Sequence, residues 1–112
     1  MNLKKIKKEL DLKILSSEEG LDKEVSGAYT SDLLSDVIAN SKKNFLWITL
    51  QIHLNIVAVA QLKELAGIII VNSREPDSDT LKKAEKEKCL LFSTEKTAFE
   101  ISGKLYQLLK GK

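Results

Sequence analysis

The sequence predicts a single α/β domain over residues 1–112, with a mainly parallel sheet of about four to five strands flanked by helices. Strand-like apolar runs alternate with amphipathic helical patterns along the whole chain. Two of these runs, residues 45–50 and 67–71, are apolar almost throughout, which is typical of strands covered on both faces. A length of 112 residues with one proline and five scattered glycines leaves no linker that would divide the chain.

The first thirty residues predict a helix followed by two short strands. In residues 2–10 the apolar side chains are three and four positions apart and therefore share one helical face. The intervening lysines fill the solvated side of that helix. We expect strands near 12–14 and 25–30, separated by a turn at Gly20 within SSEEG. These two strands form either a hairpin or an antiparallel edge.

A second helix is predicted over residues 31–42. Thr30 or Ser31 can cap it, because a short hydroxyl side chain accepts from the free N–H groups of the first turn. Asp32 falls in that turn, where the helix dipole favours an anion. The spacing indicates a buried stripe made of Leu33, Leu34, Val37 and Ile38.

The remaining elements alternate regularly. We expect strands over 45–50, 67–71 and 89–92 and helices over 55–66, over about 79–87, and from Thr94 onward. The helix over 55–66 is apolar all round in its first half, which predicts deep burial, and Gly67 ends it. Asp77 or Ser78 caps the next helix. The last helix buries a face made of Ala98, Ile101, Leu105 and Leu108.

Composition excludes several classes of protein. The 18 basic and 16 acidic residues give a net charge of +2, too small to indicate nucleic-acid binding. No apolar run approaches the roughly 20 residues of a membrane span, and the basic N-terminus leads into no apolar signal segment. Cys89 is the only cysteine, so no intrachain disulfide forms. We therefore expect a cytoplasmic globular protein.

Polar residues follow each predicted strand and define a candidate site. Ligands of open parallel sheets bind beyond the carboxyl ends of the strands, and helix N-termini there offer free N–H groups to an anion such as phosphate. The same residue types also serve as helix caps, so capping alone is the alternative to a shared ligand site. The candidates are Tyr29, Thr30, Ser31, Asp32, Gln51, His53, Asn55, Asn72, Ser73, Arg74, Ser93 and Thr94.

Catalytic and metal chemistry have little support in the sequence. His53, the only histidine, follows a strand, whereas Cys89 begins one, so the two are expected at opposite ends of the sheet. Neither a zinc site nor a Cys–His nucleophile pair is therefore expected. Arg74, the only arginine, suits a phosphate or carboxylate group, or else pairs with Glu75 or Asp77. Glycine-rich phosphate loops of the GxxxxGK[ST] and GxGxxG types and the GxSxG nucleophile elbow are absent. No enzyme activity and no cofactor are expected.

Several stretches resemble the DRTGG domain family, and together they cover nearly the whole chain. They are residues 21–37 (LDKEVSGAYTSDLLSDV), residues 46–77 (LWITLQIHLNIVAVAQLKELAGIIIVNSREPD) and the Ser93–Thr94 junction. The family is named for a short Asp-Arg-Thr-Gly-Gly segment. Asp22 and Gly27 match its first and last positions, Lys23 stands in place of arginine, and the residues between them differ. A glycine at the last position permits a positive φ or a close backbone approach.

The resemblance implies a fold similar to the N-terminal domain of HPr kinase/phosphorylase. DRTGG domains also occur in CBS-domain-containing pyrophosphatases and at the front of some phosphotransacetylases, where they are accessory or regulatory. The resemblance therefore implies a non-catalytic regulatory module that forms a homodimer. Such a module is expected to act on a partner enzyme or regulatory protein and to bind an anionic small molecule. The alternatives are a nucleotide or phosphometabolite sensor as the main role and, last, a phosphotransferase-related enzyme. Fold analogy does not by itself transfer function.

Overall fold

The predicted order of helices and strands is confirmed over residues 1–16 and 18–111, the part of the chain that the computed structural model describes. The helices are α1 (Leu3–Glu9), α2 (Leu34–Asn40), α3 (Asn55–Leu62), α4 (Ser78–Glu87) and α5 (Ala98–Lys110). The strands are β1 (Lys13–Ile14), β2 (Gly27–Thr30), β3 (Phe45–Thr49), β4 (Gly67–Ile70) and β5 (Leu91–Ser93). Residue 17, in the predicted turn, lies outside the described residues.

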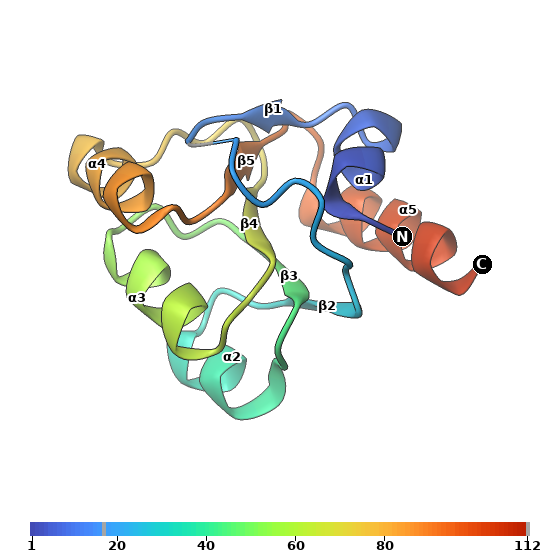
Figure 1. The fold of residues 1–112 in the computed structure, drawn as a ribbon, viewed down its shortest axis with the longest axis horizontal. Coiled ribbons are helices and arrows are strands. Elements are labelled where there is room, and N and C mark those ends of the chain that lie inside the picture. Colours follow the sequence, from blue (N-terminus) through green and yellow to red (C-terminus); the bar gives the residue numbers. More distant parts are fainter. Residues whose placement is uncertain (17, 112) are drawn as a thin grey trace.

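The five described strands form one sheet in the order β1-β5-β4-β3-β2 (Figure 1). Strands β2 to β5 run parallel, and β1 pairs antiparallel with β5. The antiparallel edge predicted for the early strands is therefore confirmed for β1. A hairpin of β1 and β2 is wrong, since the two lie at opposite edges. The segment between them instead binds the start of α1, where the N–H groups of Leu3 and Lys4 donate to the carbonyls of Lys23 and Leu21 at 2.9 and 2.8 Å.

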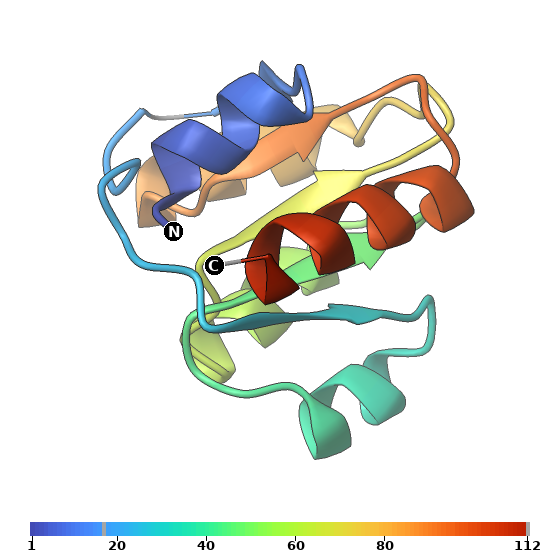
Figure 2. The ribbon, with the colours of Figure 1, turned by 90° about the vertical axis from the view of Figure 1, so that its right-hand side faces the viewer.

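Helices cover both faces of the sheet. Figure 2 shows α1 and α5 on one face, and α2, α3 and α4 lie on the other. The core is accordingly two clusters, with Leu46, Ile48 and Phe92 facing α1 and α5, and Trp47 and Leu91 facing the other three helices. Each large apolar side chain buried this way contributes on the order of 1.5–3 kcal/mol. Both faces being covered explains why the sequences of β3 and β4 are apolar throughout.

Helix α2 begins later and is less buried than predicted. It starts at Leu34, because the Oγ of Ser31 accepts from the N–H of Leu33 at 3.1 Å rather than capping a helix that begins there. Asp32 lies outside the helix. Of the predicted stripe only Val37 is fully buried, and Leu33 and Ile38 are 64% and 38% exposed. The helix thus begins three residues later than predicted, and Leu33 stands before it as the N-cap.

The other helix ends also differ from the prediction. Helix α5 begins at Ala98 rather than Thr94, and Thr97 with Glu100 forms a capping box. Helix α3 ends at Leu62, where the chain reverses through Glu64 at a φ of 54°. Asp77 stands at the N-cap of α4, but its side chain makes no capping hydrogen bond. Local capping chemistry therefore locates a helix only to within a few residues.

Candidate ligand site at the carboxyl edge of the sheet

The carboxyl ends of β2, β3, β4 and β5 lie along one edge of the sheet. The parallel register pairs Thr30 with Ile48, Thr49 with Ile70, and Ile70 with Ser93. The predicted common direction of these four strands is confirmed, so their polar exits follow one another along a single rim. What those residues do there differs between the two halves of the rim.

At the exits of β2 and β3 the polar groups bind one another. The Asp32 carboxylate accepts from the Thr49 hydroxyl at 2.8 Å and from the Leu50 N–H at 2.7 Å. The Gln51 side-chain amide donates to the Asp32 carbonyl at 2.8 Å. The indole of Trp47 donates to the Ser31 carbonyl at 2.8 Å. We call Ser31, Asp32, Thr49 and Gln51 the closed network, because its members lock the two strand exits together.

The side chains of Tyr29 and Thr30 bind helices on opposite faces of the sheet rather than the other residues of this rim. The Tyr29 hydroxyl donates to the Asp36 carboxylate of α2 at 2.8 Å, and this bond raises the pKa of Tyr29 and lowers that of Asp36. Thr30 shares a hydrogen bond of 2.7 Å with Ser102 of α5. Both residues therefore join β2 to a helix.

His53, Asn55 and Arg74 lie further along the rim. The His53 ring is 73% exposed, with its Nδ1 3.8 Å from the Asp77 carboxylate. Asn55 is the exposed first residue of α3. The Arg74 guanidinium donates to the Leu50 carbonyl at 3.0 Å, and within the described residues it forms no ion pair with Glu75 or Asp77. Arg74 thus reaches from the exit of β4 back to the exit of β3.

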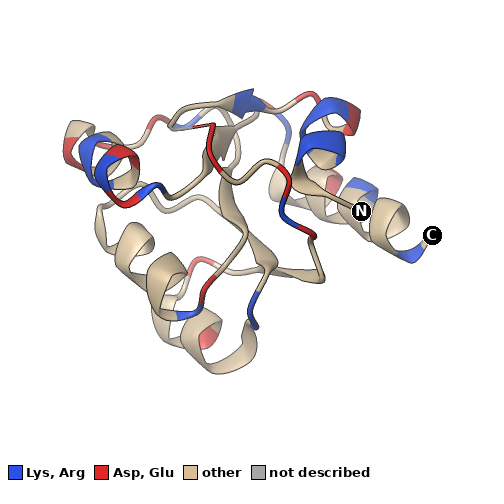
Figure 3. Cartoon of the chain, viewed as in Figure 1, with Lys and Arg blue, Asp and Glu red and all other residues tan. Residues whose placement is uncertain are grey.

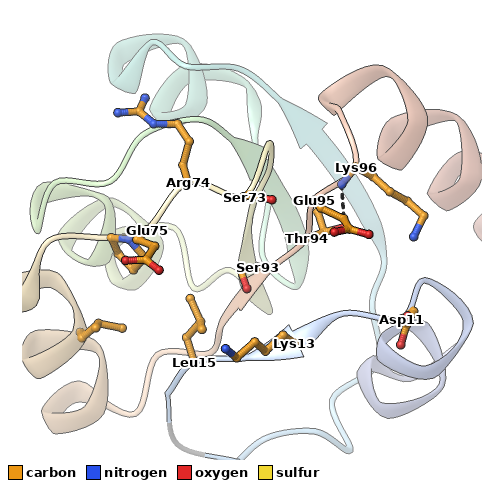
Figure 4. A pocket seen from close by; sticks show the side chains of 12 residues that line it. Asp11, Lys13, Leu15, Ser73, Arg74, Glu75, Ser93, Thr94, Glu95 and Lys96 are labelled. Carbon is orange, nitrogen blue, oxygen red and sulfur yellow. Dashed lines mark hydrogen bonds between the residues drawn. The ribbon is translucent and has the colours of Figure 1, made fainter.

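The exits of β4 and β5 border a cavity of about 510 Å³ (Figure 4). Four of the predicted candidates line it: Ser73, Arg74, Ser93 and Thr94. The other walls come from β1, the start of α4 and the loops after β4 and β5. The full lining is Asp11, Lys13, Leu15, Ser73, Arg74, Glu75, Pro76, Leu81, Ser93, Thr94, Glu95 and Lys96.

Backbone hydrogen bonds hold the two loops of this cavity together. The N–H groups of Asn72 and Ser73 donate to the carbonyls of Lys96 and Thr94, both at 2.9 Å. Asn72 and Ser73 both have a positive φ, 61° and 54°, and this turn aims their N–H groups at the neighbouring loop. Thr94 also accepts from the Lys96 N–H at 3.1 Å through its hydroxyl (Figure 4). The cavity therefore has a fixed frame with side chains projecting around it.

The sequence-based candidates missed Lys13, which pairs directly with Ser93 across β1 and β5. Because β1 runs antiparallel, its first residue reaches the edge where β5 ends. Figure 4 shows the Lys13 side chain beside Ser93 and Leu15. The alternation of polar and apolar residues indicates a strand here. It does not show that this strand pairs with the last strand of the chain.

The cavity combines an apolar wall with charges of both signs. Leu15, Pro76 and Leu81 form the apolar part. Three basic side chains (Lys13, Arg74, Lys96) and three acidic ones (Asp11, Glu75, Glu95) stand around it. Elsewhere both signs also mix, as along α4 in Figure 3, while the lysines of α1 lie on its solvated side. The cavity is thus distinguished by its shape and apolar wall rather than by net charge.

Residues of the DRTGG-like motif lie at the opposite edge, where the parallel strands begin. Asp22 and Lys23 are exposed, and Gly27 opens β2. A Cβ on Gly27 would meet the ring of Phe45 at 2.6 Å, so of the two reasons considered for this glycine the structure supports close approach. Cys89 lies at this edge too, and burial raises the pKa of its thiol to about 11, against use as a nucleophile.

Neither a metal-ion cluster nor a membrane-spanning helix occurs in the described residues. Residues 1–16 and 18–111 hold no group of three His, Cys, Asp or Glu side chains placed to bind a metal ion. In the same part of the chain no helix is long and apolar enough to span a membrane.

The fold is similar to that of a known regulatory region. Neither a protein-family model nor a curated protein matches the sequence. Among solved structures, the chain is similar to the CBS and DRTGG domains of the regulatory region of Clostridium perfringens pyrophosphatase, complexed with its activator diadenosine tetraphosphate. The TM-score is 0.71 at 14% identity, over 95% of this chain and 46% of that one. This chain resembles a DRTGG-like domain in its fold. It spans less than half the length of its structural neighbour.

Proposed function

We propose that this chain is a non-catalytic regulatory module that senses an anionic small molecule in the cavity between β1, β4 and β5. The observation that carries the proposal is the cavity itself. Its volume, about 510 Å³, falls in the range of small-molecule pockets. Its frame is fixed by backbone hydrogen bonds and its cations come from three separate segments. The structural neighbour, a regulatory region that binds a nucleotide activator, supports the same class of function.

Among anions, a nucleotide suits the lining better than inorganic phosphate. A bare phosphate would meet as many carboxylates as cations. A nucleotide separates its two chemistries, since its base packs on an apolar wall and its phosphates need cations. Leu15, Pro76 and Leu81 offer the wall, and Lys13 and Lys96 offer the cations. The Glu75 carboxylate can accept from an exocyclic amine of the base.

The proposed role is regulatory because the cavity lacks the parts of a catalyst. Ser93 and Thr94 have no histidine beside them, and the only histidine lies at the β3 exit, 3.8 Å from Asp77. The last alternative is a phosphotransferase-related enzyme, by analogy with HPr kinase/phosphorylase. Incubating ATP with the protein and following phosphate release tests it, and steady turnover would replace the regulatory proposal.

Binding is tested by calorimetry and thermal shift with AMP, ADP, ATP, diadenosine tetraphosphate and inorganic phosphate. We expect at least one nucleotide to raise the melting temperature and inorganic phosphate to leave it unchanged. Lys13→Ala should weaken nucleotide binding by about tenfold, since charge-assisted hydrogen bonds are the strong ones. Lys42→Ala, an exposed lysine at the other edge, is the matched control and should bind like the parent. Flat melting temperatures across the panel would contradict the proposal.

The proposal includes a homodimer, a cytoplasmic location and a partner enzyme or regulatory protein. The apolar segment 55–62 offers no surface for a dimer, because Ile56, Val57, Val59 and Ala60 are buried within the chain. A dimer therefore needs a different surface. Light scattering coupled to gel filtration tests the homodimer. The closer likeness to the N-terminal domain of HPr kinase also belongs to this proposal.

A further inference from the structure

The outward face of α5 carries two aromatic side chains that are largely exposed. Phe99 is 88% exposed, more than any other large apolar side chain in residues 1–16 and 18–111, and Tyr106 is 59% exposed. The inward face of the same helix buries Ile101 and Leu105 completely. The inward face of α5 is thus packed against the sheet, whereas these two aromatic side chains are largely exposed to solvent.

The two aromatic residues lie on one side of the helix with small residues between them. Positions seven apart are two helical turns apart and share a face, and Ser102 and Gly103 lie between Phe99 and Tyr106 on that side. A Cβ on Gly103 would meet nothing within 4 Å. Glycine is disfavoured in a helix interior relative to alanine, and no contact inside the chain requires it here. A glycine at this position allows a second helix to approach closely.

A groove adjoins this face. It lies between α5 and the edge strand β2 and has a volume of about 520 Å³. Tyr106 and Ser102 form its helix side, and Ala28 and Ile48 form its sheet side. Figure 2 shows α5 lying across the sheet next to β2. The lining is mostly apolar, so a large apolar side chain from outside, such as a phenylalanine, fits it.

We propose that a second copy of this chain docks on this surface, with the two α5 helices antiparallel. Charge favours the self-pairing, because the first turn of α5 carries Glu100 and its last turn carries Lys110, while Glu95 and the neighbouring Lys96 precede the helix. Antiparallel helices set each acidic end against a basic end, whereas parallel helices set like charges together. A two-fold axis near Ser102 and Gly103 places Phe99 of each copy opposite Tyr106 of the other, at the mouth of the groove.

This inference rests on the homodimer of the proposed function and names its surface, the α5 face, made of Phe99, Ser102, Gly103, Tyr106 and Lys110. The Lys110 ammonium stacks on the Tyr106 ring at 5.5 Å, which keeps both side chains on that face. The ligand cavity does not contribute to this surface.

Sedimentation equilibrium of the parent and of Phe99→Glu provides the test. The parent should dimerise at micromolar concentration, and Phe99→Glu should raise the dimer dissociation constant by about tenfold or more. Leu62→Glu, which changes a 67% exposed apolar side chain on α3, is the matched control and should leave the constant unchanged. Circular dichroism melting checks that each variant is folded.

Two further variants locate the contact and its direction. Gly103→Cys should form an intermolecular disulfide under mild oxidation, and Ala39→Cys on the exposed side of α2 should not. Lys110→Glu should weaken association, and adding Glu100→Lys to the same chain should restore it. A parent that is monomeric at these concentrations overturns both the homodimer and this surface. A dimer that survives Phe99→Glu overturns the α5 face and leaves the homodimer standing, and failure of the double charge exchange overturns the antiparallel arrangement.

Discussion

The two halves of the carboxyl rim have similar residues and opposite properties. At the exits of β2 and β3, Asp32, Thr49 and Gln51 use their hydrogen-bonding groups on one another and on the backbone. At the exits of β4 and β5, the backbone groups of the two loops bind each other, and the side chain of Ser93 borders a cavity. The cavity thus lies in the half of the rim where backbone hydrogen bonds join the two loops.

The largest effect should come from breaking the closed network. Asp32→Ala removes acceptors from the Thr49 hydroxyl and the Leu50 N–H, so we expect a loss of about 2–3 kcal/mol in the free energy of unfolding. Urea unfolding measures it. Asp22→Ala, at an exposed carboxylate on the opposite edge, should change stability by less than about 0.5 kcal/mol. Equal midpoints for Asp32→Ala and the parent would show that the network is not structural.

Arg74 joins the two halves, and its removal should affect both stability and binding. Arg74→Ala loses the bond to the Leu50 carbonyl and one cation of the cavity. We expect a loss of about 1 kcal/mol in stability together with weaker nucleotide binding. Unfolding and calorimetry on one preparation separate the two. A variant that loses stability but binds nucleotide as before would assign Arg74 to the closed half alone.

The smallest effect concerns the bond between Tyr29 and Asp36, and it depends on pH. The bond lowers the pKa of Asp36 from 3.8, so its stabilisation is present above that pH and is lost as the pH falls further. It raises the pKa of Tyr29 from 10.0, so the stabilisation is also lost as the pH rises beyond that value. Tyr29→Phe should therefore be less stable than the parent between these limits and approach it outside them. Thermal unfolding across pH measures the difference, and a gap that does not vary with pH would contradict this cause.

The order of the elements could be predicted from the sequence because each one carries a strong local pattern. The continuous apolar runs of β3 and β4 indicated burial on both faces, and alternating strands and helices indicated parallel pairing. The start of α2 could not be predicted, since Asp32 binds Thr49 across the sheet. Nor could the membership of Lys13 in the cavity, since it depends on a pairing between residues 13 and 93. Contacts between distant segments leave no local periodicity.

The pairing of β1 with β5 also couples the early part of the chain to any bound molecule. Lys13, in a strand of two residues, and Leu15, directly after that strand, both line the cavity. The Leu15 N–H donates to the Leu91 carbonyl at 2.8 Å and the Ser16 hydroxyl donates to the Cys89 carbonyl at 2.7 Å, and these bonds anchor the segment. So short a strand opens easily by itself. A ligand bound in the cavity would keep β1 paired with β5. Ligand binding would therefore slow the hydrogen exchange of the Leu15 amide. The signal of such a module would then be the rigidity of its edge rather than a change of shape.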